Sequence, residues 1–175
     1  MTDFSPDHAL MMDSALSQQV EIFPFLALFT WIAILMYGKG SEVFHFFDLF
    51  YLLVLMVIHE LIHGFFFKVL GDENTKVKFG FKSGMAYATS PGSRYSRKRM
   101  LVIILAPFVL ISLALTLIYD LHILTAASYI VFASFHAAGC AGDFFLAATI
   151  LQQKGDIAVE DTEVGINIYQ KENTK

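Results

Sequence analysis

The chain is poor in charge and contains a single cysteine. Only 16% of its 175 residues are charged, whereas 56% are hydrophobic, and the mean hydropathy is +0.59. This composition excludes an ordinary soluble domain and is typical of a protein embedded in a membrane. Because Cys140 has no second cysteine to pair with, an internal disulfide is also excluded.

The N-terminal segment lacks basic residues altogether. No Lys or Arg occurs in residues 1–21, so the basic n-region of a secretory signal peptide is missing. We expect residues 1–21 to form an N-terminal tail. A short helix on the membrane surface and a loosely ordered segment fit its pattern equally well.

Four long stretches are rich in apolar residues and poor in charge: 22–37, 44–69, 100–119 and 121–151. A helix needs about 20 mostly apolar residues to cross a bilayer. The first stretch is short and contains Pro24, so we expect it to be tilted or partly interfacial. The pattern predicts an all-α polytopic membrane protein with about four transmembrane helices in a domain of residues 22–151. Residues 152–175 then form a polar C-terminal tail, with one strand near residues 166–169.

Basic residues are concentrated in the connection between the second and third predicted spans. Eight of the twelve lie there: Lys68, Lys76, Lys78, Lys82, Arg94, Arg97, Lys98 and Arg99. Cytoplasmic loops carry such an excess, so we expect this connection and both termini to lie in the cytoplasm. We interpret the run as a topology signal and expect no nucleic-acid partner. Within it, residues 75–89 alternate in places around Ser83-Gly84, which predicts a small cytoplasmic β-hairpin.

The segment "VIHELIHGFFF" contains two histidines and a glutamate inside the second predicted span. His59 and His63 are four residues apart, so on a helix they project from one face. Two such imidazoles can bind one Zn²⁺, and Glu60 beside them can take a proton from a water whose pKa the metal lowers to about 7. The alternative interpretation is that these side chains form hydrogen bonds that stabilise the packing between helices. Ionisable residues within transmembrane helices usually have a functional role, which favours a metal site over structural hydrogen bonds.

A catalytic zinc usually has three protein ligands, and the segment "HAAGCAGD" offers His136, Cys140 and Asp143. On one straight helix all three share a face. If the second and fourth spans run in the same direction, Asp143 lies at the depth of His63, so we prefer Asp143 as the third ligand. His136 could then polarise the substrate or orient a metal ligand, or it could simply form a hydrogen bond between helices. Cys140 is either a small packing residue or a ligand.

Several segments occur in an order that resembles a known family: "HELIHG", "KFGFKSGMAYATSP", "LAPF", "HAAGCAGD" and "VEDTEVGINIY". Across residues 44–169 they are similar to the small bacterial "putative zincin peptidases", a family of unknown function. The chain also resembles site-2-type intramembrane metalloproteases. This likeness implies zinc bound by His59, His63 and Asp143, Glu60 as the general base, and a place in the bacterial cytoplasmic membrane. Those proteases have an N-P-D-G-like context around the aspartate, whereas this chain reads "GCAGD", so the likeness supports zinc more firmly than proteolysis.

The leading hypothesis is therefore a zinc-dependent intramembrane metallopeptidase that hydrolyses peptide bonds of membrane proteins or peptides. A non-enzymatic metal-binding membrane protein is the alternative. A haem protein, with His59 or His63 facing His136, is a third hypothesis, but it leaves Glu60 and Asp143 without a role.

Overall fold

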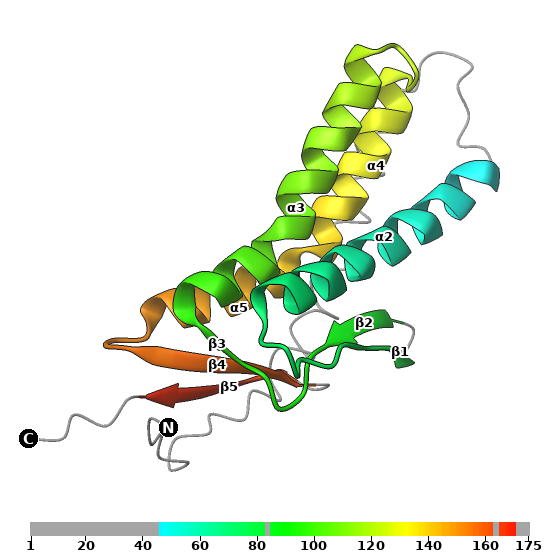
Figure 1. Ribbon diagram of the computed structural model, residues 1–175. Helices are drawn as coiled ribbons and strands as arrows, with labels where there is room; N and C mark the ends of the chain where they lie inside the picture. The colour runs from blue at the N-terminus through cyan, green and yellow to red at the C-terminus, as the bar shows by residue number, and fades with distance from the viewer. Residues whose placement is uncertain (1–45, 83–84, 163–164, 171–175) are drawn as a thin grey trace, which may run out of the picture.

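The computed structural model describes residues 46–82, 85–162 and 165–170. Over these residues the chain forms four helices and two antiparallel sheets. The helices are α2 (Phe46–Leu70), α3 (Arg97–Asp120), α4 (Ala126–Gly139) and α5 (Ala141–Gln152). The three-stranded sheet lies near the end of α2 and the start of α3, whereas the two-stranded hairpin lies along α2 (Figure 1).

Two of the described helices, α2 and α3, are long and apolar enough to cross a membrane by length and composition. Much of the surface of α2 is apolar and exposed, as at Phe50, Leu53 and Phe65. Large exposed apolar side chains of this kind are stable against lipid and costly in water. The two helices therefore indicate association with a membrane.

The first sheet is the hairpin predicted from the sequence. Strand β1 (Lys78–Lys82) pairs antiparallel with β2 (Met85–Thr89), from Lys78 opposite Thr89 to Lys82 opposite Met85. The hairpin packs along α2. Gly64 of α2 makes this close approach possible, because a Cβ at that position would collide with the ring of Phe79.

The second sheet was not predicted. Strand β4 (Ile157–Thr162) lies between β3 (Arg94–Ser96) and β5 (Gly165–Gln170), and both pairings are antiparallel. Its apolar residues pack against the ends of the helices in the larger of two hydrophobic clusters, which also contains the fully buried Tyr95. The Tyr95 hydroxyl donates to the carbonyl oxygen of Phe67 at 3.1 Å and so ties β3 to α2.

The prediction of an all-α protein with four spans is wrong. The predicted strand near residues 166–169 is present as β5, but it belongs to a three-stranded sheet. In the expected polar tail, Ile157, Ala158 and Val159 of β4 are buried side by side, whereas in β5 the buried residues Ile166 and Ile168 alternate with less buried ones. Glu160 and Asp161 directly follow the buried residues of β4 and made the segment look polar. The pairing of β4 with β3 joins segments more than 60 residues apart in sequence, which no local pattern reveals.

The number of spans differs from the prediction as well. Besides α2 and α3, only the pair α4–α5 could form a third span within the described residues. The two helices are long and apolar enough only when taken together, and they are bent by 43° at the break between them. The prediction of one continuous span at 121–151 overlooked the break at Cys140, between the two helices. The first predicted span (22–37) and the N-terminal tail (1–21) lie outside the described residues.

Some of the clustered basic residues bind the ends of helices. Arg97 donates to the carbonyl oxygens of Gln153 and Gly155, at 2.8 and 2.7 Å, where α5 has ended. Arg99 donates to the carbonyl of Leu70 at the end of α2, at 3.3 Å. Cations are favourable at helix C-termini, where carbonyls lack partners. This end of the molecule is therefore held together by residues that the sequence analysis used only as a topology signal.

Candidate metal centre

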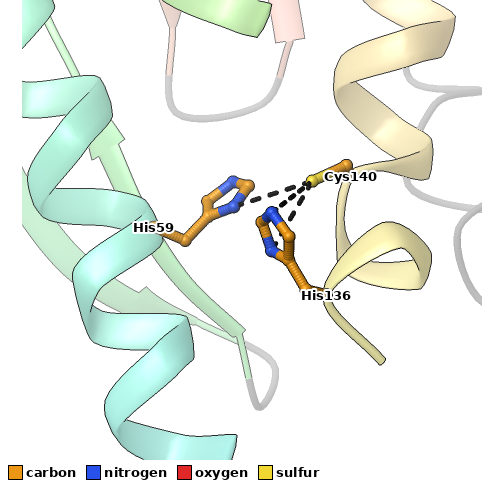
Figure 2. A group of neighbouring side chains, drawn as sticks. All are labelled: His59, His136 and Cys140. Carbon is orange, nitrogen blue, oxygen red and sulfur yellow. Dashed lines mark hydrogen bonds between the residues drawn. The ribbon is translucent and has the colours of Figure 1, made fainter. Parts of the chain in front are cut away.

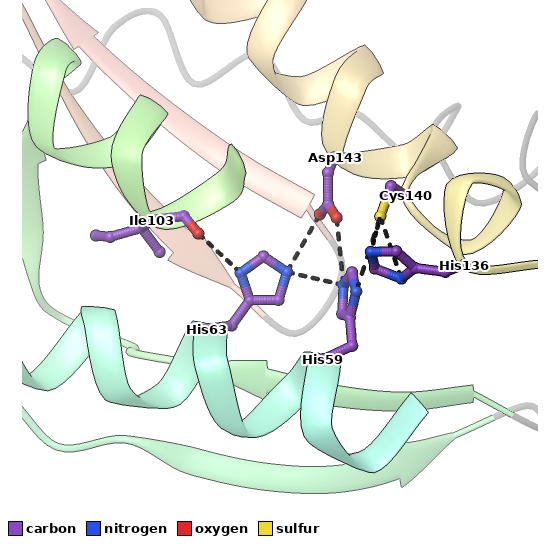
Figure 3. A network of polar contacts seen from close by, with 6 residues as sticks. All are labelled: His59, His63, Ile103, His136, Cys140 and Asp143. Atoms are coloured by element: carbon purple, nitrogen blue, oxygen red, sulfur yellow. Dashed lines mark hydrogen bonds and ion pairs between the residues drawn. The ribbon is translucent and has the colours of Figure 1, made fainter. Parts of the chain in front are cut away.

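Two helices bring His59, His63 and Asp143 together. The histidines lie one turn apart on α2, and Asp143 lies in the first turn of α5, directly after the bend (Figure 3). The Nε2 atoms of the two histidines are 3.1 Å apart. The Asp143 carboxylate reaches His59 Nε2 at 3.2 Å and His63 Nε2 at 3.4 Å. Thus the three residues singled out from the sequence converge on one point between α2 and α5.

The spacing of these atoms fits a zinc ion. Zinc bonds of about 2.0–2.1 Å to nitrogen and oxygen in a tetrahedral arrangement place neighbouring ligand atoms about 3.3 Å apart. The observed separations of 3.1, 3.2 and 3.4 Å are close to that edge. In addition, the Oδ2 atom of Asp143, which lies 3.2 Å from His59 Nε2, is buried with no hydrogen bond among the residues that the structure describes. A buried cluster of acceptor atoms repels itself unless a cation or proton lies among them.

The orientation of His63 is fixed from behind by α3. Its Nδ1–H donates to the carbonyl oxygen of Ile103 at 3.0 Å in a buried hydrogen bond. This carbonyl is free because the residue four positions later is Pro107, which has no N–H to donate within the helix. Donation from Nδ1 leaves the lone pair of Nε2 directed at the candidate site, as in known metal sites where a backbone carbonyl orients a ligating imidazole.

His59 is oriented more weakly, by sulfur. Its Nδ1 lies 3.9 Å from Cys140 Sγ (Figure 2), whereas its other ring nitrogen, Nε2, faces Asp143. Cys140 Sγ is also 3.8 Å and 3.7 Å from the two ring nitrogens of His136. Near-equal distances to both nitrogens place the sulfur beside the ring rather than along one lone pair.

His136 is held in an aromatic environment. It is buried, its ring stacks on Phe108 with centroids 6.2 Å apart, and it lies edge-on to His59 at 5.7 Å. His59, His136 and Cys140 nevertheless form a second group whose ligand atoms lie within 4.8 Å of one another. Because His59 belongs to both groups, a metal in the second group would require its other ring nitrogen.

Glu60 lies between the histidines and the hairpin. Its half-buried carboxylate faces the backbone N–H of Ala88 in β2 and is close enough to both histidines to interact with their charge. The motif therefore places the carboxylate at the boundary between the metal ligands and the β2 edge. The sequence predicted Glu60 as a base, but not that a strand would hold it.

Three groups near the site had not been predicted. The carbonyl of Ile103 and the amide of Ala88 belong to the backbone, although the proline in "LAPF" does indicate a free carbonyl four residues earlier. The third is Asp161 of β4, whose Oδ2 atom is buried without a hydrogen-bond partner among the described residues. Burial, followed by the charges of Glu60 and Asp143, raises the pKa of Asp161 to about 7.

The comparison with known proteins agrees with this geometry. No curated protein and no solved structure matches the sequence. One family model, described as "Putative zincin peptidase", matches residues 52–158, which include both histidines, Glu60 and Asp143. Since the match covers more than half of the chain, the chain belongs to this family of putative zincin peptidases.

Proposed function

We propose that the protein is a zinc-dependent metallopeptidase that cleaves peptide bonds within or beside the membrane. Membership of the zincin family supports the reaction class. The two membrane-length helices support the location, because both candidate ligands on α2 lie inside one of them.

The observation that carries the proposal is the convergence of His59, His63 and Asp143 at separations of 3.1–3.4 Å. These three residues would hold the zinc ion. When bound, zinc supplies a Lewis acid that polarises a carbonyl oxygen and makes water acidic enough to attack at neutral pH. The Ile103 carbonyl keeps His63 in the tautomer that presents Nε2 to the site.

Glu60 is the proposed general base. It takes a proton from the attacking water and passes it to the leaving amine, which a carboxylate next to the first ligand can reach. The N–H of Ala88 limits where this carboxylate can turn. The position of Glu60 is therefore coupled to β2, and whatever binds along β2 is brought close to the base.

An extended peptide is the proposed substrate. The carbonyls of a helix are already hydrogen-bonded, so a transmembrane substrate must unwind before its amide can react. Among the described residues β2 pairs only with β1, so its other edge, which faces α2, has no strand partner; we propose that the substrate adds there. Because alternate residues point their backbone groups to the same side, Ala86 directs its N–H to the same side as Ala88.

Cleavage of peptides by the wild type and by Glu60→Gln in liposomes tests the proposal. The substitution keeps the volume of the side chain and removes the base, so the rate should fall about 10²–10⁴-fold while zinc content is unchanged. Glu73→Gln, at an exposed loop position, is the matched control and should cleave at the wild-type rate. A wild type that cleaves no member of a broad panel of single-span peptides contradicts the proposal.

A non-enzymatic metal-binding protein is the second candidate. The grouping of His136 and Cys140 around the second nitrogen of His59 favours it, because adjacent donor sets suit the transfer of a metal. Under this alternative Glu60→Gln would change no cleavage product, and His136→Ala would slow the exchange of radioactive zinc. A metallopeptidase predicts the opposite outcome for Glu60.

A further inference from the structure

A pocket of about 170 Å³ lies between α2 and the hairpin, beside the candidate metal centre. Glu60 is the one charged residue in its lining, which otherwise consists of Val57, Leu61, Phe79, Gly80, Ala86 and Tyr87. For comparison, an apolar cavity of about 150 Å³ in another protein binds benzene. The pocket is therefore large enough for one leucine or phenylalanine side chain.

The walls of the pocket come from two elements that differ in their surroundings. Leu61 and Val57 belong to the face of α2 that is exposed in the structure, with 53% and 51% of their surfaces accessible. Tyr87 and Phe79 belong to the hairpin. The pocket thus opens on the same apolar surface that α2 would present to lipid, so an apolar side chain could enter it from the bilayer without crossing water.

The small residues of the hairpin keep the pocket open. Gly80 has no Cβ, and a Cβ there would collide with the phenol of Tyr87. Ala86 lies on the open edge of β2, two residues before Ala88, whose N–H faces Glu60. A strand added along this edge would therefore carry one side chain to the pocket and its neighbouring amide to Glu60.

We propose that this pocket is a specificity subsite, which receives an aliphatic or aromatic side chain from the substrate residue next to the scissile bond. The inference rests on the proposed peptidase function and adds the substrate class: peptide segments with a large apolar residue at the cleavage site. Hydrolysis then takes place where an apolar residue is anchored beside Glu60.

The test changes the size of the pocket in both directions. A mixture of single-span peptides in liposomes is cleaved by the wild type and by variants, and the cleavage sites are mapped by mass spectrometry. Leu61→Ala enlarges the pocket and should shift the residue at the cleavage site from Leu towards Phe and Trp. Ala86→Leu fills it and should shift the preference towards Ala and Gly. A difference of one or a few methylene groups in such a pocket changes relative kcat/KM by about 10–200-fold.

Leu53→Ala is the matched control. It removes the same atoms from the same helix at an equally exposed position, 54% accessible, but about 12 Å along the axis and outside the pocket. Its cleavage preference should equal that of the wild type. Zinc content and circular dichroism of each variant establish that the site and fold remain intact, and Leu61→Ala tests the proposal even if Ala86→Leu does not fold.

The possible results distinguish a failure of the proposed subsite from a failure of the proposed peptidase function. A wild type that cleaves peptides, together with a Leu61→Ala variant whose preference is unchanged, overturns the subsite and leaves the peptidase function standing. A preference that changes equally in Leu53→Ala also overturns it. A wild type that cleaves nothing overturns the peptidase function, and the subsite falls with it.

Discussion

The Nδ1 atom of His63 lies 3.0 Å from the carbonyl oxygen of Ile103. The two residues are 40 positions apart, and a proline makes their contact possible, because Pro107 withholds the N–H that would otherwise occupy this carbonyl. A helix-disfavouring residue in α3 thus provides an acceptor that orients a candidate zinc ligand on α2.

Replacing Pro107 by alanine should weaken zinc binding. The new N–H competes with His63 for the Ile103 carbonyl, so a smaller fraction of His63 keeps its proton on Nδ1. Loss of such orienting partners costs about 10–100-fold in metal affinity, and we expect the lower end of this range, since the carbonyl can accept two bonds. Competition with a zinc chelator measures the affinity, and ¹⁵N spectra of histidine report the tautomer.

Leu110→Ala, at an exposed position on the same helix, is the control for this experiment. It should bind zinc as the wild type does. If Pro107→Ala bound zinc with wild-type affinity and an unchanged His63 spectrum, the proline would have no influence on the site.

Zinc content should identify the third ligand. The wild type should contain about one Zn²⁺ per chain, and Asp143→Ala should lose it, because two histidines alone leave a weak site. Cys140→Ala should retain the metal with at most about 100-fold lower affinity, since it removes only the weak partner of His59. The control is Asp120→Ala, which changes an exposed aspartate at the end of α3. Metal retained in Asp143→Ala and lost in Cys140→Ala would show that the wrong third ligand had been chosen.

The membrane topology can be tested at one position in the basic connection before α3 and one in the turn after α3. The basic connection should face the cytoplasm, so a cysteine at Glu73 should react with an impermeant reagent only after the cells are opened. A cysteine at Leu121, in the turn after α3, should react from outside. Both positions are exposed, and the native Cys140 is buried, so it should give little background. The reverse labelling pattern would invert the predicted orientation.

The contribution of Asp161 to the stability of the metal-free protein should fall as the pH rises from about 4 to about 7. The pKa of Asp161 is raised from 3.8 to about 7, mainly by burial, so the folded state holds a proton that the unfolded state has released. Protonation therefore favours folding below the folded pKa, and this contribution is lost as the pH passes through about 7. Asp161→Asn should remove this contribution, so the midpoint of thermal unfolding of the variant should rise relative to that of the wild type between pH 4 and pH 8.

The exposed Asp156, five residues earlier, provides the matched control. In detergent, Asp156→Asn should keep the wild-type dependence of the unfolding midpoint on pH. A dependence of the unfolding midpoint on pH that Asp161→Asn leaves unchanged would show that Asp161 does not titrate in this range.

The sequence by itself determined the features that depend on local spacing. Two histidines four residues apart share a helix face wherever that helix lies, which is why His59 and His63 are adjacent. Long apolar stretches form helices because only a helix satisfies its own backbone in lipid, and this gave α2 and α3. The hairpin of β1 and β2 followed from alternation around a short turn.

Only the tertiary structure decided which distant groups meet. The bend at Cys140, the pairing of β4 with β3, and the contacts of Ile103 with His63 and of Ala88 with Glu60 all join segments that no local period relates. Two of these contacts use backbone atoms, which every residue carries, so side-chain identity does not signal them. Local spacing thus predicted the histidines and the glutamate, while the fold supplied the groups that orient them.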